Sequence, residues 1–266
     1  MGVPVLVEKS FLKIVDLLFA ILPQRTPSLI ALQQCRIVSH RGEHDNKIIF
    51  ENTIEAFDLA ASHGVWGLEF DIRWSVDLVP VVFHDEDCLR VFGGDKLISQ
   101  MTFGEIRDRF PLIPSLEEVI RRYGKSNHLM VELKKSTYPQ PVLQTEKLKD
   151  LFQGLCPAED YHFITLDLPM FDHVNFLEPK ALLPVGEMNF KQMSEAALSK
   201  RYGGVTGYFL FFNDRLVSKH QAQGQQIGTG FPASRNALYR EINRNIDWIF
   251  SNHAVKLQQI IKQQLS

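Results

Sequence analysis

The stretch RIVSHRGEHDNKIIFENTIEAFDLAASHGVWGLEFDI, residues 36–72, predicts the fold of the chain. It begins with the apolar run RIVSH (36–40), continues into a helix predicted over residues 52–62, and ends with the apolar run GLEFDI (67–72). A strand, a helix and a strand in this order form a βαβ unit, because parallel neighbouring strands need a long crossover between them. The chain is therefore expected to contain a mostly parallel sheet.

The same alternation continues towards the end of the chain. Eight short apolar runs are predicted as strands: RIVSH (36–40), LEFDI (68–72), LMVEL (129–133), HFITL (162–166), LLPV (182–185), VTGYF (205–209), QIGTG (226–230) and DWIF (247–250). Eight parallel strands with helices between them close into a (β/α)8 TIM barrel, which can hold 266 residues in one domain. We predict an α/β chain with an N-terminal helical extension over residues 1–34, a single barrel domain over 35–258, and a C-terminal helix end over 259–266.

The run PVVFHD (80–85) lies too close to the second predicted strand to be its parallel neighbour. The link SVDLV is too short for a crossover, so the run is expected to fold back as a hairpin arm. This arm would return His84 to the mouth of the barrel. Residues 86–114 are expected to form a small insertion that overhangs the mouth, and Ser115 with Glu118 has the spacing of a capping box for the next helix.

Composition and charge exclude some classes of partner. Hydrophobic residues make up 45% of the chain and the formal net charge is −2, whereas a nucleic-acid-binding domain usually carries an excess of basic residues. Cys35, Cys88 and Cys156 show neither CxxC spacing nor a disulfide-scaffold pattern, so buried free thiols in a reducing, cytoplasmic compartment are expected. We expect no nucleic-acid partner, and the sequence does not indicate an oligomeric state.

The apolar segment FLKIVDLLFAILP, residues 11–23, is too short to span a bilayer and contains Lys13 and Asp16. No small-residue cleavage signature follows it, so neither a signal peptide nor a transmembrane helix is expected. Ser10 is its predicted N-cap, and its apolar residues cover more than one helical face. The segment is therefore expected either to pack under the barrel or to lie against a membrane surface or a partner.

Acidic residues recur in two predicted strands. Glu69 and Asp71 are two residues apart in one strand, and Glu132 and Lys134 in another, so each pair points to one face of the sheet. Three carboxylates among apolar side chains are costly unless their charge is compensated. Mg²⁺ or Ca²⁺, which take oxygen ligands, would compensate it. The alternative is a salt-bridge network formed with Lys134 and Arg41 alone.

Two histidines and two basic side chains are expected beside these acids. His40 ends the first predicted strand and His84 the hairpin arm, and two imidazoles at one barrel mouth suit paired acid and base catalysis. Arg41 offers a planar fork for a phosphate or carboxylate, and Lys134 adds a point charge. The carboxyl ends of strands are where barrel active sites lie, which favours a catalytic over a structural role for the histidines.

Glu51 and Asn52 stand where a helix is predicted to begin. Asn52, with Glu55 three residues later, has the spacing of a helix cap, and this role competes with direct contact to a substrate. Glu51 is not needed for capping. It is expected to orient Arg41 or His40.

These segments together resemble the glycerophosphodiester phosphodiesterase family. The resemblance depends on HRG (40–42), ENTIEAF (51–57), GLEFDIRWSVDLVPVVFHDEDCLR (67–90) and VELKK (131–135), in this order. It implies an insertion after the hairpin arm and a hydrolase that cleaves a glycerophospho-alcohol to glycerol 3-phosphate and the free alcohol. It also implies three sets of site residues: the metal ligands Glu69, Asp71 and Glu132, the acid/base pair His40 and His84, and the phosphate-binding Arg41 and Lys134.

At two strand ends the chain departs from the family pattern. Residues 228–231 read Gly-Thr-Gly-Phe where members often carry Trp-Thr-Val-Asn, which predicts the loss of an aromatic wall from the pocket. Residues 165–167 read TLD where a Ser-Phe pair is more usual. A lysophospholipase D or sphingomyelinase D type of activity on lipids with one acyl chain is therefore the alternative function. A non-catalytic phosphate-binding barrel is a second alternative.

Overall fold

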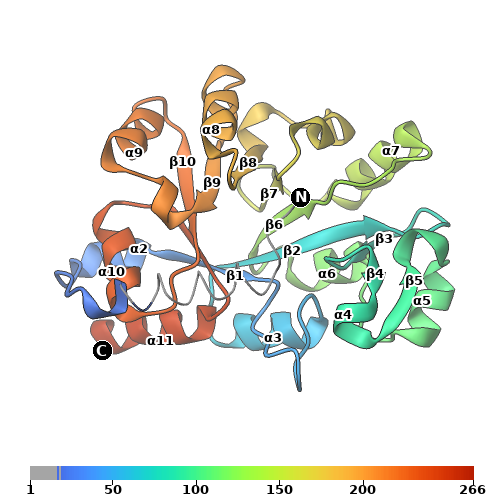
Figure 1. Cartoon of the computed structure of the whole chain (residues 1–266), viewed down its shortest axis with the longest axis horizontal. Helices are drawn as coiled ribbons and strands as arrows, with labels where there is room; N and C mark the ends of the chain where they lie inside the picture. The colour runs from blue at the N-terminus through green and yellow to red at the C-terminus, as the bar shows by residue number, and fades with distance from the viewer. Residues whose placement is uncertain (1–16, 18) are drawn as a thin grey trace.

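The computed structural model describes residue 17 and residues 19–266, which contain a closed barrel (Figure 1). Neighbouring strands of the wall follow the order β1-β2-β6-β7-β8-β9-β10-β11, all parallel, and β11 pairs again with β1. The strands are β1 (Arg36–His40), β2 (Gly67–Trp74), β6 (His128–Leu133), β7 (Tyr161–Thr165), β8 (Leu182–Gly186), β9 (Gly204–Tyr208), β10 (Gln226–Gly230) and β11 (Trp248–Ser251). The predicted (β/α)8 barrel is confirmed.

Helices surround this wall (Figure 1). The α-helices outside the insertion are α2 (Leu29–Gln34), α3 (Ile54–Ser62), α6 (Leu116–Tyr123), α7 (Pro141–Leu151), α8 (Phe190–Ser199), α9 (Asp214–Gln221), α10 (Arg235–Asn243) and α11 (Ala254–Leu265). Two 3-10 helices, η2 (Leu168–Val174) and η3 (Pro179–Ala181), join β7 to β8, and η4 (Phe209–Phe211) follows β9. A large apolar cluster lies between the strands and the helices, and a smaller one fills the barrel interior.

A hairpin arm and an insertion follow β2, as predicted. Strand β3 (Pro80–Val82) pairs with β2 in the antiparallel direction. The insertion contains β4 (Asp87–Cys88), α4 (Leu89–Phe92), β5 (Gly94–Leu97), η1 (Ile98–Gln100) and α5 (Phe103–Arg109). It has a small apolar core of its own, and Gly94 is required there because a Cβ would lie 2.4 Å from Phe110. Helix α6 begins with the predicted capping box of Ser115 and Glu118.

The helix predicted from residue 52 begins at Ile54, and its predicted N-cap, Asn52, is wrong by one residue. Thr53 is the N-cap, and its hydroxyl accepts a hydrogen bond from the Ala56 backbone N–H. Asn52 instead has a left-handed backbone, with φ 58°, and its Nδ2 donates to Asp71 Oδ2 at 2.9 Å. Asparagine tolerates this conformation better than most residues. Because Thr53 caps the helix, the Asn52 side chain is available to the polar cluster at the barrel mouth.

Part of the predicted N-terminal segment lies outside the described residues, namely 11–16 and 18, as does Ser10. In the described part, Phe19 packs edge-on against Phe209 with ring centroids 5.2 Å apart, and Arg240 lies over the Phe19 ring. Leu17 and Ile21 are exposed. None of the helices in the described ranges is long and apolar enough to cross a membrane.

The cysteine prediction is only partly correct. All three cysteines are free, but Cys88 alone is buried, Cys35 is half-buried and Cys156 is exposed. Cys156 lies in the surface turn before β7, where its backbone N–H donates to the Asp160 carboxylate. A turn at the surface places the thiol outside the core, which the wide spacing of the cysteines did not indicate.

A buried histidine pair lies at the amino-terminal end of the barrel, away from the mouth. His128 Nε2 and His162 Nδ1 are 2.8 Å apart, and His128 Nδ1 lies 2.9 Å from the Glu159 carbonyl oxygen. The Glu159 carbonyl oxygen accepts a hydrogen bond from His128 Nδ1. Trp66 stacks on His128 and Trp248 packs edge-on against His162. Burial lowers the pKa of His128 to about 4 and that of His162 to about 3.

We expect this pair to make the fold sensitive to acid. Both rings stay neutral in the folded protein, whereas each takes up a proton in the unfolded chain below about pH 6.5. Stability should therefore fall as the pH decreases from about 6.5 towards about 4, by at most about 1.4 kcal/mol per pH unit for each group. His162→Gln retains an N–H donor, and it should flatten the dependence of melting temperature on pH in this range. Equal slopes for wild type and variant would contradict this role.

Candidate active site

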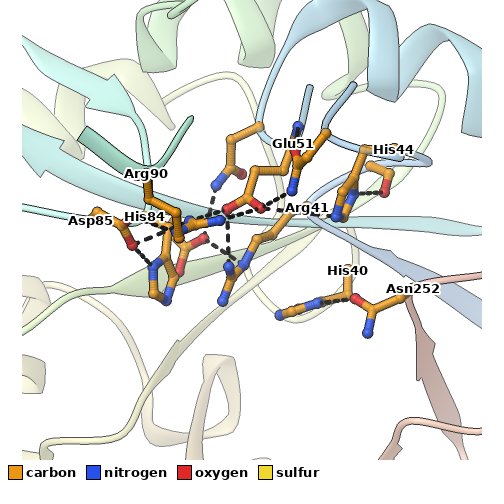
Figure 2. A network of polar contacts seen from close by, with 12 residues as sticks. His40, Arg41, His44, Glu51, His84, Asp85, Arg90 and Asn252 are labelled. Carbon is orange, nitrogen blue, oxygen red and sulfur yellow. Dashed lines mark hydrogen bonds and ion pairs between the residues drawn. The ribbon is translucent and has the colours of Figure 1, made fainter. Parts of the chain in front are cut away.

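The candidate active site lies at the carboxyl ends of β1, β2 and β6. The strand register aligns His40 with Glu69 and Asp71 with Glu132, so side chains from three neighbouring strands converge. Glu69, Asp71 and Glu132 each place a carboxylate oxygen within 4.8 Å of the others. Figure 2 shows the polar network that surrounds this cluster, with Arg41 near its centre. The three predicted metal ligands thus lie together.

Burial and neighbouring charges shift the pKa values of Glu69 and Asp71 in opposite directions. Burial, together with the charges of Asp71 and Glu132, raises the pKa of Glu69 well above its usual value. Burial also acts to raise the pKa of Asp71, but Lys134 and Arg41 outweigh it and hold that pKa well below the usual range. The Glu69 carboxylate has no ion pair with a lysine or arginine among the described residues. It is the acid whose charge most needs a further cation.

The salt bridges of the cluster leave some oxygens unsatisfied. Lys134 Nζ lies 3.3 Å from Asp71 Oδ1, and Arg41 Nε lies 3.3 Å from Asp71 Oδ2. Glu69 Oε1 and Asn52 Oδ1 are buried without a hydrogen-bond partner in the described part of the chain. Buried polar atoms normally have a partner. A hard divalent cation with oxygen ligands fits this donor set better than the salt-bridge network alone does.

Arg41 connects the cluster to the loop that follows β1. Its backbone has a φ of 57°, its N–H donates to Glu69 Oε2 at 3.1 Å, and its Nη1 donates to Glu51 Oε1 at 3.0 Å. Glu51 also accepts from Asn46 Nδ2 at 2.6 Å. Of the two residues that Glu51 was expected to orient, it contacts Arg41.

His40 is held on both sides of its ring. Its Nδ1 lies 2.6 Å from Asn252 Oδ1 (Figure 2). The Phe231 ring lies beside it at a centroid distance of 4.7 Å. Burial, with the positive charge of Arg41, lowers the pKa of His40 to about 3. The Asn252 oxygen requires a hydrogen on Nδ1. Nε2, which lies 3.8 Å from Glu69 Oε2, is therefore an unprotonated nitrogen directed towards the acids.

His84 is held by the residue that follows it. Its Nδ1 lies 2.5 Å from Asp85 Oδ1, which leaves Nε2 directed away from that carboxylate. Arg73 Nε donates to the His84 carbonyl oxygen at 2.8 Å and fixes the backbone at this position. The backbone N–H of the preceding residue, Phe83, donates to the Asp71 carbonyl oxygen at 3.0 Å, which places His84 beside the acid cluster. Both predicted acid/base histidines thus lie at the same mouth as the carboxylates.

Several residues of the network were not predicted from the sequence, among them Asp85, Arg90 and Asn252. Asp85 is adjacent to His84, and Asn252 directly follows the last strand, so their positions alone could have indicated the mouth. Arg90 lies in the insertion and reaches Glu51, 39 residues earlier in the chain. Nothing in a local sequence pattern predicts that contact.

Comparison with known proteins agrees with this geometry. The family model described as "Glycerophosphoryl diester phosphodiesterase family" matches residues 40–234. The chain belongs to this family. The match begins at His40 and includes every predicted site residue.

Several members of the family are similar to this chain. A glycerophosphodiester phosphodiesterase of Caldanaerobacter subterraneus is 28% identical over 161 residues, which cover 56% of this chain and 63% of that protein. Human glycerophosphodiester phosphodiesterase 1 is 36% identical over 92 residues, covering 32% of this chain and 27% of that protein. The aligned segments are thus less than two thirds of either relative.

Solved structures of the family share the fold. A phosphodiesterase of Oleispira antarctica, in complex with the product sn-glycerol-3-phosphate, has a TM-score of 0.71 at 24% identity, covering 87% of this chain and 99% of that one. A glycerophosphodiester phosphodiesterase of Thermotoga maritima has a TM-score of 0.70 at 22% identity, covering 85% and 98%.

The unequal environments of Glu69 and Asp71 lead to different predictions for two amide variants. Glu69→Gln removes charge from a repulsive position, so its melting temperature without metal should equal or exceed that of the wild type. Asp71→Asn leaves Arg41 and Lys134 without their shared carboxylate, so it should be destabilised by about 3 kcal/mol. Added Mg²⁺ or Ca²⁺ should raise the melting temperature of the wild type and have little effect on either variant.

Thermal melting with and without chelator measures both effects. The salt-bridge alternative would be supported if the cations left the wild-type melting temperature unchanged and activity survived exhaustive chelation.

Proposed function

We propose that the protein is a metal-dependent phosphodiesterase that hydrolyses glycerophosphodiesters to glycerol 3-phosphate and an alcohol. One observation carries the proposal: three carboxylates, two basic side chains and two histidines converge at one barrel mouth. The family membership supports it. The Oleispira structure with its bound product supports glycerol 3-phosphate as the product here.

Glu69, Asp71 and Glu132 would hold the cation, which we propose to be Mg²⁺ or Ca²⁺. Both ions accept carboxylate oxygens and complete their coordination with water or substrate. When bound, the cation would supply Lewis-acid stabilisation of charge on the phosphate oxygens.

Arg41 and Lys134 would bind the phosphate. Lys134 Nζ pairs with Glu132 Oε1 at 2.7 Å, and Arg41 Nη1 with Glu51 at 3.0 Å, so both cations are held at the edge of the acid cluster. A phosphate at this edge would meet donors that are already ordered. Such preorganised charges stabilise a transition state more effectively than mobile ones.

The two histidines would divide the proton transfers. The Asn252 oxygen holds the hydrogen of His40 on Nδ1, and the free Nε2 suits this ring to remove a proton from the nucleophile. His84 would then protonate the leaving alkoxide. The nucleophile is proposed to be the neighbouring glycerol hydroxyl, because an attacking group within the substrate is already positioned. Water would open the resulting cyclic glycerol phosphate.

Substrates with different leaving groups test the roles proposed for His40 and His84. His84→Ala should lower kcat by about 100-fold or more on a choline or ethanolamine diester, because a basic alkoxide needs a proton to leave. On a p-nitrophenyl diester the loss should be small, since p-nitrophenolate leaves without one. His40→Ala should be impaired on both substrates. A His84→Ala variant that is equally impaired on both would contradict the assignment, and His40→Ala serves as the matched control.

A lysophospholipase D type activity remains the second candidate, because exposed apolar side chains follow two strands of the barrel. Met188 follows β8 and is 90% exposed, and Leu210 and Phe211 follow β9 and are also exposed. Phe231, which follows β10, lies beside His40 and adds an aromatic ring there, while position 228, where the family often carries a tryptophan, is a glycine. These side chains would suit an acyl chain, and a membrane contact through residues 11–23 would belong to the same candidate.

Rates on two substrates decide between the candidates. We expect metal-replete protein to release glycerol 3-phosphate from glycerophosphocholine with a higher kcat/KM than it releases choline from lysophosphatidylcholine. A higher kcat/KM on lysophosphatidylcholine would favour the second candidate. Binding of glycerophosphocholine for hours without any product would indicate the non-catalytic phosphate-binding barrel instead.

A further inference from the structure

Arg90 connects the insertion to the active site. It lies in α4 and donates to two carboxylates (Figure 2). Its Nη1 and Nη2 form a bidentate pair with Glu51 at 2.9 and 2.6 Å, while its Nε and Nη2 contact Asp85 at 2.6 and 3.2 Å. One planar guanidinium therefore fixes two acids from different parts of the chain.

Each of these acids holds one residue of the proposed machinery. Asp85 accepts from His84 Nδ1 at 2.5 Å, and Glu51 accepts from Arg41 Nη1 at 3.0 Å. The chain of contacts thus runs from the proposed acid, His84, through Arg90 to the proposed phosphate-binding group, Arg41. Loss of the Arg90 side chain would release both His84 and Arg41 from these contacts.

We propose that Arg90 is a positioning residue that sets the orientation of His84 and Arg41 at the same time. The proposal deepens the proposed function and rests on it. Arg90 does not bind the substrate in this arrangement, because four of its five N–H groups are directed at the two carboxylates. Its effect is transmitted through Asp85 and Glu51.

Aromatic contacts fix the position of α4, the short helix that carries Arg90. Phe92, two residues later in the same short helix, packs against Phe83 beside the hairpin arm and Phe110 after α5, with ring centroids about 6 Å apart, and against Phe50 in the loop after β1 at 5.3 Å. The helix that carries Arg90 is thereby attached to the barrel on both sides of the site. Lysine could not reproduce the contact, since a single ammonium does not bridge two carboxylates with this geometry.

Arg90→Ala should lower kcat by about 10- to 100-fold and raise KM for glycerophosphocholine several-fold, because both His84 and Arg41 lose their fixed orientation. A purely structural role would reduce the folded fraction and apparent kcat, with KM unchanged. Arg90→Lys should recover part of the kcat loss and little of the KM change. Arg107→Ala is the matched control, because Arg107 belongs to the same insertion and pairs with Glu118 outside the network; its kinetics should equal the wild type.

A spectroscopic measurement tests the inference independently of turnover. In nitrogen-detected NMR of the metal-free protein, the neutral form of the His84 ring should carry its hydrogen on Nδ1 in the wild type and become a mixture of tautomers in Arg90→Ala. An unchanged tautomer, or wild-type kcat and KM in Arg90→Ala, would overturn the positioning role. If the wild type hydrolyses no diester, the proposed function is wrong. The His84 tautomer in wild type and Arg90→Ala then tests the positioning role of Arg90 by itself.

Discussion

Excess negative charge at the carboxyl ends of β2 and β6 is the constraint on which the site depends. Three carboxylates lie within 4.8 Å of one another inside a barrel of apolar side chains. Such a cluster is stable only when cations and donors surround it closely. Lys134 and Arg41 meet Asp71, the Arg41 backbone N–H and His40 face Glu69, and Asn52 donates to Asp71.

The loop between β1 and α3 is shaped by this constraint. Arg41 and Asn52 both adopt left-handed backbone conformations, and the Asn52 N–H donates to the Arg41 carbonyl oxygen at 2.9 Å. The loop is thereby closed at its base, and both side chains point into the charged cluster. Capping of α3 falls to Thr53. The sequence spacing at Asn52 predicts a helix cap, but in the structure the Asn52 side chain donates to Asp71 in the charge cluster. This contact determines the role of Asn52.

Charged side chains and exposed apolar side chains come from different loops of the barrel. Charged groups come from β1, β2 and β6, from the arm after β3, and from the insertion. Exposed apolar residues follow β8 and β9. In the proposed function, the phosphate of the diester lies against the charges, and the loops after β8 and β9 are the candidate contacts of its alcohol. The fold brings the ends of all eight strands to one rim, so a single substrate can contact several of these loops.

The sequence by itself determined the barrel, because alternating apolar runs and helices constrain neighbouring segments through local geometry. It also indicated Glu69, Asp71 and Glu132, since residues two apart in a strand must share a face. Only the tertiary structure decided that Asn52 serves the charge cluster, that Asn252 orients His40, and that Arg90 reaches Glu51. These contacts join segments up to 212 residues apart. Their partners are selected by the closure of the barrel and the docking of the insertion, and no local periodicity carries that information.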